Sequence, residues 1–179
     1  MAGKDIEDTE MEKSNIVLIG MPGAGKSTVG VVLAKSMGLK FVDSDLVIQD
    51  TYGKLLHELI EENGVQGFWK IENDVNASLT MEKSVIATGG SVIYGAEAME
   101  HLGTIGTVVY LELPYEDVAE RLGDLNARGV TLQPGQTLKD LYEERTPLYE
   151  KYAHITVKCH GKMLREVVAE VAKAVTAEK

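Results

Sequence analysis

The chain has 179 residues, enough for one compact domain with a hydrophobic core and too few for two domains of ordinary size. Its 44% hydrophobic and 26% charged residues are typical of soluble globular proteins and exclude disordered, collagen-like and coiled-coil classes. The 18 Lys and Arg against 28 Asp and Glu give a net charge of −10, so we expect no nucleic acid and no membrane as partner. An anionic substrate would therefore need a local basic site.

The start of the chain and its single cysteine indicate where the protein works. Residues 1–15 are polar and acidic and lack the features of a signal peptide. No apolar run reaches the roughly 20 residues of a membrane-spanning helix. One cysteine, Cys159, excludes an intramolecular disulfide framework and a multi-cysteine zinc site. We therefore expect a disordered tail over residues 1–15, a single domain over residues 16–179, and a cytoplasmic location.

Short runs of β-branched residues alternate along the chain with longer segments of helical periodicity. This alternation predicts βαβ units, in which helices cover both faces of a parallel sheet. The predicted strands are residues 16–19, 41–42, 84–88, 108–111 and 155–157.

Two helices and one loop stand out between these strands. One helix is predicted from Ser27 to a stop at Gly38, because apolar residues repeat at helical spacing before the glycine. Its expected inward residues are Val29, Val32, Leu33 and Met37. The last helix has an apolar face made of Leu164, Val167, Val168, Val171, Ala172 and Val175. Between them, glycines and a proline interrupt the periodicity, and we predict a mobile loop, a lid, near residues 123–136.

A phosphate-binding motif follows the first predicted strand. The stretch Gly20 to Thr28 reads GMPGAGKST and matches the P-loop pattern G-x-x-x-x-G-K-[ST] between a strand and a helix. Backbone N–H groups and a helix N-terminus would then point at one polyphosphate. Lys26 would reach the β- and γ-phosphates, and the Ser27 hydroxyl would bind Mg²⁺. The expected nucleotide contacts are Gly23, Ala24, Gly25, Lys26, Ser27 and Thr28.

Two carboxylates follow the second predicted strand. We interpret Asp43 to Asp45 as an extended segment whose carboxylates face different partners, one serving a metal ion and the other an acceptor hydroxyl. These are the parts that a kinase needs beyond the P-loop. A helix N-cap at Ser44 or Asp45 is the alternative interpretation. The chain has no guanine-reading N-K-x-D segment, which disfavours a GTPase.

From residue 16 to residue 157 the chain resembles the shikimate kinase family of P-loop kinases. The family's Asp-x-Asp motif matches Asp43 and Asp45, and its next helix, D-x-x-I-x-x-x-x-G, is similar to Asp45 through Gly53. Its acceptor-site glycine turn looks like Gly89-Gly90-Ser91, its adenine-side arginine like Arg121, and its lid arginine like Arg128. Its R-x-P-x-Y motif appears as residues 145–149.

The resemblance implies an α/β P-loop NTPase fold with three layers, similar to nucleoside-monophosphate kinases, and a five-stranded parallel sheet in the order 2-3-1-4-5. It also implies ATP and Mg²⁺ as cofactors and a small carboxylic acid with a hydroxyl group as acceptor. Lys26 and Arg128 would stabilise the transferring phosphoryl group, and Ser27 and Asp43 would organise Mg²⁺. Asp45 would hold the acceptor hydroxyl and Arg145 the acceptor carboxylate.

On the acceptor side, this sequence departs from the family pattern at several positions. The family's pattern of phenylalanine, arginine, two residues and glutamate appears here as residues 68–72, with Glu72 as the glutamate. Trp69 stands where the family has this second substrate-binding arginine, with Lys70 as an uncertain substitute one position on. Ser91 replaces the third glycine of the turn, and Gly129 follows Arg128 where the family has proline. Trp69 either lines the acceptor pocket or packs without touching substrate. The expected acceptor contacts are Asp45, Trp69, Gly89, Gly90, Ser91 and Arg145.

Because of these departures, more than one acceptor is compatible with the sequence. Shikimate and a smaller hydroxy amino acid, with L-homoserine as the leading example, are both compatible with one arginine and one aspartate. A nucleotide-binding regulator without transfer activity and an interaction module are the alternatives from other classes. We expect a monomer.

Overall fold

The structure is a computed structural model that describes residues 13–123, 130 and 132–179. At its centre lies a sheet with the strand order β2-β3-β1-β4-β5, in which every neighbouring pair is parallel. The strands are β1 (Asn15–Ile19), β2 (Lys40–Asp43), β3 (Ser84–Ala87), β4 (Gly106–Glu112) and β5 (Ile155–Lys158). The predicted α/β fold, with its five parallel strands in this order, is thus confirmed.

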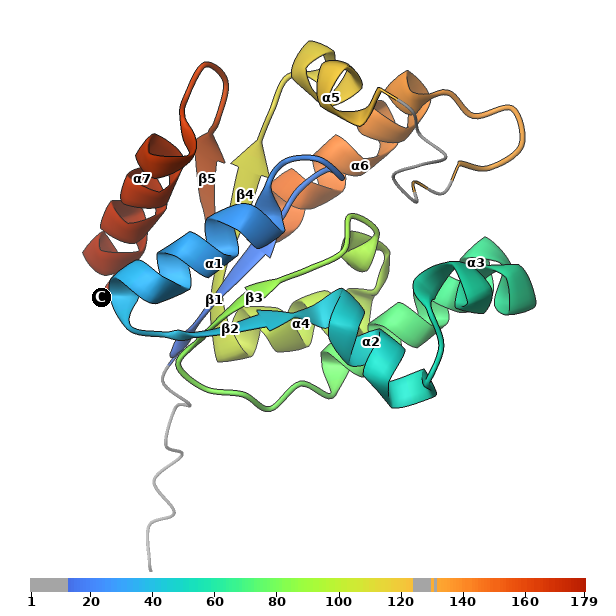
Figure 1. Ribbon diagram of the computed structural model, residues 1–179, viewed down its shortest axis with the longest axis horizontal. Helices are drawn as coiled ribbons and strands as arrows, with labels where there is room; N and C mark the ends of the chain where they lie inside the picture. The colour runs from blue at the N-terminus through green and yellow to red at the C-terminus, as the bar shows by residue number, and fades with distance from the viewer. Residues whose placement is uncertain (1–12, 124–129, 131) are drawn as a thin grey trace, which may run out of the picture.

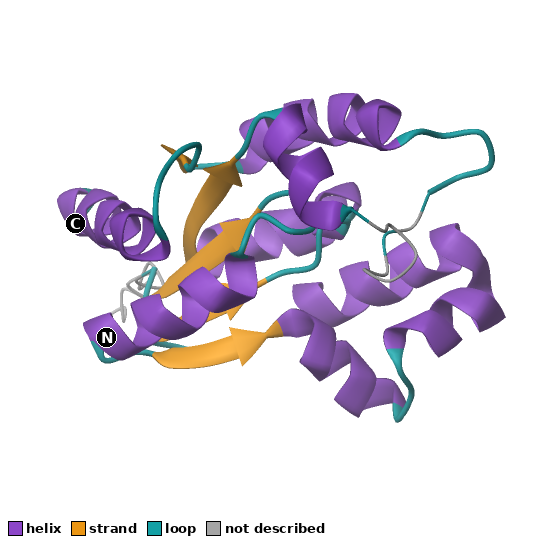
Figure 2. Ribbon diagram, turned by 45° about the horizontal axis from the view of Figure 1, so that its top comes forward, coloured by secondary structure: helices purple, strands orange, loops and turns teal. Residues whose placement is uncertain are grey.

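Helices cover the sheet on both faces and complete three layers. They are α1 (Lys26–Met37), α2 (Ser44–Tyr52), α3 (Leu56–Ala77), α4 (Ala96–Ile105), α5 (Tyr115–Leu122), α6 (Leu138–Tyr152), α7 (Leu164–Ala177) and the short 3₁₀ turn η1 (Val92–Tyr94). α1 and α4 lie on opposite faces, α7 lies beside α1, and α2 and α3 lie beyond the carboxyl end of β2 (Figures 1 and 2). Both faces being covered, β1 and β3 are buried along their whole length, as a parallel sheet requires.

The two predicted helices form, but in each of them one residue of the predicted apolar face is exposed to solvent. In α1, Val29 and Leu33 are buried, whereas Val32 is 38% exposed, because it lies off the face that packs on the sheet. In α7 the valines are buried, whereas Leu164 is 40% exposed at the first turn. Gly38 ends α1 in the left-handed conformation, as predicted.

The interpretation of Asp43 to Asp45 as an extended segment is wrong. Only Asp43 belongs to β2, and α2 begins at Ser44. The N-cap is Asp43, whose side chain accepts a hydrogen bond from the Asp45 backbone N–H, so the alternative cap at Ser44 or Asp45 is also wrong. The two carboxylates diverge because the chain changes from strand to helix between them. In a continuous strand, residues two apart would have shared a face.

Two further predictions concern the N-terminal tail and the lid. β1 begins at Asn15, so ordered structure starts inside the predicted tail, whose residues 1–12 lie outside the described ranges. Half of the predicted lid, residues 124–129 and 131, also lies outside them, and the lid stays a prediction. None of the helices in the described ranges combines the length and apolar character needed to cross a bilayer.

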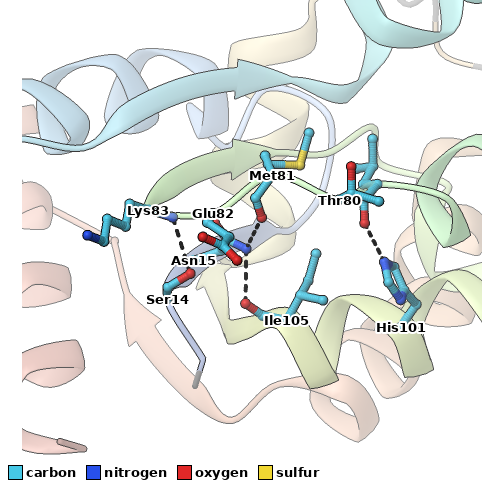
Figure 3. A pocket seen from close by; sticks show the side chains of 9 residues that line it. Ser14, Asn15, Thr80, Met81, Glu82, Lys83, His101 and Ile105 are labelled. Carbon is cyan, nitrogen blue, oxygen red and sulfur yellow. Dashed lines mark hydrogen bonds between the residues drawn. The ribbon is translucent and has the colours of Figure 1, made fainter. Parts of the chain in front are cut away.

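Asn15 ties the amino-terminal edge of the sheet together. Its side chain is 2% exposed, and its amide donates to the backbone oxygens of Met81, at 2.8 Å, and Ile105, at 3.0 Å. Its side-chain oxygen accepts from the Ser84 N–H at 3.0 Å. Figure 3 shows this side chain among the residues that line a pocket at this edge, remote from the carboxyl ends of the strands.

We expect Asn15→Ala to lower the free energy of unfolding by about 3 kcal/mol, because two buried backbone groups and one partly buried group lose their partner at once. ATP-dependent activity should remain, since the sheet's opposite edge is untouched. Urea unfolding followed by circular dichroism measures the loss. Ser14→Ala is the matched control, because the Ser14 hydroxyl accepts a single exposed bond from the Lys83 N–H. Equal stability of the two variants would contradict this role of Asn15.

Candidate active site

The polar motifs gather at the carboxyl edge of the sheet. Leu18 of β1 and Asp43 of β2 both pair in register with Ala87 of β3, so the segments that follow these strands start side by side. Thr88, directly after β3, donates its hydroxyl to the Leu18 backbone oxygen at 2.7 Å and fixes this arrangement. The loop after β1, the start of α2 and the glycine turn after β3 therefore lie side by side at this edge.

The P-loop has the backbone shape that its glycines permit. Gly23 and Gly25 have φ values of 80° and 89°, in the left-handed region that disfavours residues with a side chain. Gly25 directly precedes α1, so the helix N-terminus faces the loop. A Cβ on Gly20 would lie 2.9 Å from the Leu111 backbone oxygen, which leaves no room for a side chain there. These conformations fit a cradle of backbone N–H groups around phosphate.

Lys26 lies inside this cradle. The residue is 8% exposed, and its amine donates to the backbone oxygens of Gly20 and Met21, both at 2.8 Å. Burial lowers the pKa of Lys26 from 10.5 to about 8, opposed by the nearby charge of Asp45. The side chain is thus held beside the loop as a cation that can move onto a bound phosphate.

The two residues predicted to organise Mg²⁺ are in contact. The Ser27 hydroxyl lies at the start of α1 and donates to Asp43 Oδ2, at the end of β2, over 3.2 Å. The other carboxylate oxygen, Asp43 Oδ1, caps α2. A hydroxyl and a carboxylate beside a P-loop are oxygen ligands of the kind that Mg²⁺ prefers, and magnesium usually keeps several waters in such sites. The residues present therefore fit the predicted ion.

Asp45 and Glu72 face the glycine turn from two helices. A Cβ built on Gly89 would lie 2.8 Å from Asp45 Oδ1 and 2.7 Å from Glu72 Oε2, so both carboxyl groups border the same glycine. Burial raises the pKa of Asp45 from 3.8 to about 6, helped by the charge of Asp43 and opposed by that of Lys26. Asp45 is therefore a partly buried carboxylate that is ionised at neutral pH, as a proton acceptor must be.

Glu72 is a buried carboxyl group of α3. The residue is 2% exposed, and its Oε1 accepts a 2.6 Å hydrogen bond from the Ser91 hydroxyl. No ion pair to Glu72 occurs within the described part of the chain. Burial, opposed by the Ser91 bond, raises the pKa of Glu72 from 4.5 to about 7. Ser91, which departs from the family turn, thus supplies the hydrogen bond of this carboxyl group.

We expect Glu72→Gln to stabilise the protein at pH 8 and to change its stability little near pH 4.5. The pKa of Glu72 is about 7 in the folded protein against 4.5 as its ordinary value, so stability falls as the pH rises between these values. Glutamine keeps the acceptor for Ser91 and never ionises, which should raise the free energy of unfolding at pH 8 by about 2–3 kcal/mol.

Urea unfolding of both proteins at the two pH values measures this difference. Glu61→Gln, at an exposed position of α3 on the other side of the kink at Gly64, is the matched control for the same chemical change. A gain in stability that is equal at both pH values would contradict an ionisable, buried Glu72.

Arg145 approaches the same turn from α6. The side chain is 2% exposed, and its Nη1 lies 2.9 Å from the position where a Cβ of Gly90 would be. The Tyr149 hydroxyl, one helical turn further on, donates to the Gly90 backbone oxygen at 2.6 Å. A buried guanidinium beside a glycine turn is a strong site for a carboxylate, which it can bind with two parallel hydrogen bonds.

Trp69 lies against Tyr94 of η1. The two rings are stacked, with centroids 4.0 Å apart and planes at 20°. The indole N–H of Trp69 is buried and has no hydrogen-bond partner within the described ranges. Lys70 points elsewhere, since its amine pairs with Asp74 at 2.7 Å and its side chain is 77% exposed. Lys70 therefore does not take the place of the missing arginine.

The structure places one of the two arginines that were predicted on the nucleotide side. Arg121 of α5 is exposed and donates to the Gly23 backbone oxygen at 3.3 Å, which places it beside the P-loop as predicted. It also lines a pocket with Ala24, Thr28 and Cys159. Arg128 lies outside the described residues, so its role in the lid stays a prediction.

Sequence reasoning missed two residues of this site. Glu72 belongs to the family's glutamate position, which was a usable signal, but nothing in the sequence showed that Ser91 is its partner. Tyr94 lies between Trp69 and Arg145, and a tyrosine in a short turn gives no signal of such a contact. Tyr149, the last residue of the R-x-P-x-Y motif, is buried and holds the glycine turn.

The sheet, the loop and the paired Ser27 and Asp43 together define the class: a P-loop protein built to bind a nucleoside triphosphate with a metal ion. The family model described as shikimate kinase matches residues 22–176. The chain belongs to the shikimate kinase family. It is accordingly a phosphotransferase with a hydroxyl group as acceptor, and ATP and Mg²⁺ are its cofactors.

Individual relatives agree with this assignment. The shikimate kinase of Vibrio parahaemolyticus is 38% identical over 165 residues, which cover 90% of this chain and 96% of the relative. That of Francisella tularensis subsp. novicida is 38% identical over 162 residues, covering 88% and 92% of the two chains.

Solved structures agree as well. The shikimate kinase from Acinetobacter baumannii in complex with shikimate has a TM-score of 0.84 at 35% identity, covering 94% of this chain and 96% of that one. A gluconokinase from Sinorhizobium meliloti, at 16% identity and a TM-score of 0.52, shares only the fold. The regulator without transfer activity gains no support from these comparisons.

Proposed function

We propose that the protein transfers the γ-phosphate of ATP to a hydroxyl group of shikimate. The observation that carries the proposal is the position of Asp45 and Arg145, which border neighbouring glycines of one turn beside the P-loop. A carboxylate can accept a hydroxyl proton there, and a guanidinium can hold the carboxylate of the same small molecule. The relatives named above are shikimate kinases, and one of them was solved with shikimate bound.

On the nucleotide side, the P-loop backbone from Gly23 to Thr28 holds the phosphates, and bound ATP supplies the phosphoryl group. Lys26 moves from the loop carbonyls to the phosphates and offsets the charge that develops there. Ser27 and Asp43 hold Mg²⁺ directly or through water. Arg121 borders the pocket beyond the P-loop, where a nucleotide base fits. Arg128 would join the transferring phosphoryl group when the lid closes.

On the acceptor side, Asp45 binds the reacting hydroxyl and takes its proton as the oxygen attacks. Gly89, Gly90 and Ser91 form the turn against which the acceptor lies, since a Cβ on either glycine would collide with the side chains that border the turn. Arg145 fixes the acceptor carboxylate and thereby its orientation. Correct orientation supplies much of the rate enhancement in phosphoryl transfer, because the reacting oxygen must lie in line with the leaving group.

A second acceptor class, a hydroxy amino acid such as L-homoserine, is favoured by one observation. Trp69 removes a cation from the acceptor side, while Glu72 and Asp45 keep two carboxyl groups there. Either carboxyl group, when ionised, can pair with an ammonium group of such an acceptor. The names of the relatives favour shikimate over this class.

The release of ADP from Mg-ATP by the purified protein tests the proposal, with shikimate, L-homoserine and no acceptor measured side by side. Stimulation by shikimate supports the proposed function. Stimulation by L-homoserine alone would overturn the choice of acceptor and keep the transfer chemistry. A basal rate that neither acceptor changes would overturn both acceptors.

A further inference from the structure

We propose that Trp69 acts on the acceptor indirectly, by holding Tyr94, which in turn orients the guanidinium of Arg145. The inference rests on the proposed function, because it assumes that Arg145 binds the acceptor carboxylate. Trp69 and Tyr94 are then positioning residues for Arg145. They orient its guanidinium in a pocket that lacks the family's second substrate-binding arginine.

The first step is the contact between Tyr94 and Arg145. The Tyr94 hydroxyl accepts a hydrogen bond from Arg145 Nε at 3.3 Å and donates to Glu144 Oε2 at 2.9 Å. Arg145 Cζ also lies 5.4 Å from the centre of the Tyr94 ring, within the range of a cation–π contact. Tyr94 therefore contacts the guanidinium through both its hydroxyl and its ring.

These contacts leave the other end of the guanidinium available. The hydrogen bond to Tyr94 uses Nε, whereas Nη1 borders Gly90 in the acceptor turn. The plane of a guanidinium decides whether it can bind a carboxylate through two hydrogen bonds, because all five donors lie in that plane. A group that fixes Nε thus fixes the direction in which the remaining donors point.

The second step is the contact between Trp69 and Tyr94. The stack, with centroids 4.0 Å apart, covers one face of the Tyr94 ring and restricts its rotation. η1 has only three residues, so the backbone around Tyr94 offers little rigidity of its own. α3 supplies it instead, since Trp69 packs beside the buried cluster that contains Phe68. Because Trp69 is held by α3, it limits the movement of the Tyr94 ring and, through that ring, the movement of the Arg145 guanidinium.

A direct contact between Trp69 and the acceptor is the competing account, because the indole N–H is buried without a partner in the part of the chain that the structure describes. The two accounts differ for Trp69→Phe. Phenylalanine keeps a stacked ring and removes the N–H, so it should be tolerated if the stack matters. It should be as harmful as Trp69→Leu if the N–H binds the acceptor.

Trp69 is the only tryptophan in the chain, so its fluorescence reports on this cluster alone. In the wild-type protein with Mg²⁺ and ADP, shikimate should change the emission in a saturable way. Tyr94→Phe keeps the ring and loses the hydroxyl, and it should weaken shikimate binding in this titration about tenfold, the usual scale for losing a hydrogen bond to a charged group.

Steady-state kinetics separate positioning from general damage. Tyr94→Phe and Trp69→Leu should raise KM for shikimate about tenfold and leave KM for ATP and the melting temperature nearly unchanged, with a smaller effect on kcat. Trp69→Phe should restore KM for shikimate to within about twofold of the wild type. Lys70→Ala is the matched control on the same helix, and all its constants should stay at wild-type values.

The outcomes distinguish the inference from the function on which it rests. If shikimate changes neither the emission nor the rate of the wild-type protein, the proposed function fails and the inference falls with it. If the wild type responds and Trp69→Leu or Tyr94→Phe binds shikimate equally well, only the inference is overturned. It is also overturned if Trp69→Phe is as impaired as Trp69→Leu.

Discussion

Replacing Asp45 with asparagine is expected to lower acceptor-dependent turnover by about 10²- to 10⁴-fold while the protein still binds ATP. The carboxylate is the group that can accept the proton of the acceptor hydroxyl, and an amide of the same shape cannot. ATP binding should persist because the P-loop contacts of Lys26 and the bond between Ser27 and Asp43 do not involve the Asp45 side chain.

The pH dependence of turnover gives this prediction a second readout. The pKa of Asp45 is about 6, so the ionised base is lost as the pH falls through this value. Wild-type turnover should therefore decrease below about pH 6, and the residual turnover of Asp45→Asn should lack that decrease.

Rapid-quench kinetics measure the rate of phosphoryl transfer, and calorimetric titration measures the affinity for ATP. Asp50→Asn, at an exposed position of the same helix, is the matched control and should behave like the wild type. A folded Asp45→Asn protein that no longer binds ATP would show that Asp45 belongs to the nucleotide side. If the Asp45→Asn variant turned over as fast as the wild type, Asp45 would not be the base.

The second large effect is expected for Gly89→Ala. The new methyl group would lie within 2.8 Å of carboxylate oxygens of both Asp45 and Glu72, closer than real Cβ contacts. The carboxyl group of Glu72 is held by its bond to Ser91, and the Asp45 carboxylate would have to turn away from its present position to make room. The φ angle of Gly89 is not positive, so alanine meets no backbone strain and the effect is one of space.

We expect this variant to lose about 10²-fold in kcat/KM for the acceptor, on the scale that a misplacement of about 1 Å causes. The KM for ATP should change little. Gly103→Ala in α4 is the matched control, since its Cβ would make only ordinary contacts with His154, the nearest at 3.8 Å. Wild-type kinetics for Gly89→Ala would show that the carboxyl groups move aside and that the turn is not a tightly fitted floor.

The sheet could be predicted from sequence because its physical requirement is visible there. Strands covered on both faces must be short apolar runs, and βαβ connections separate them by helices, which is the pattern around residues 16–19 and 108–111. The P-loop was equally visible, because its glycines and lysine follow one another. The helix faces were predicted less well, as Val32 and Leu164 show, because an apolar residue can also lie in solvent.

The acceptor side could be predicted only in part. Asp45, Gly89 and Arg145 were found through the resemblance, and the structure brings them together. The divergence of Asp43 and Asp45 depends on where β2 gives way to α2, a boundary that periodicity does not fix to one residue. The partnership of Glu72 with Ser91 and that of Trp69 with Tyr94 join distant parts of the chain. No local pattern contains such pairs.

The Ser91 to Glu72 hydrogen bond, together with Trp69 three residues earlier on the same helix, constrains the order in which substitutions can accumulate. Ser91→Gly alone would leave a buried carboxyl group without its hydrogen bond. Trp69→Arg alone would place a cation on the face of α3 that Glu72 shares, and would remove the stack on Tyr94. The effects of the two reversions should therefore be non-additive, since each alters the partner of the same carboxyl group. By this argument Trp69→Arg would precede Ser91→Gly in a lineage that exchanges one acceptor pocket for the other, because the new cation would give Glu72 a partner before the Ser91 hydroxyl is lost.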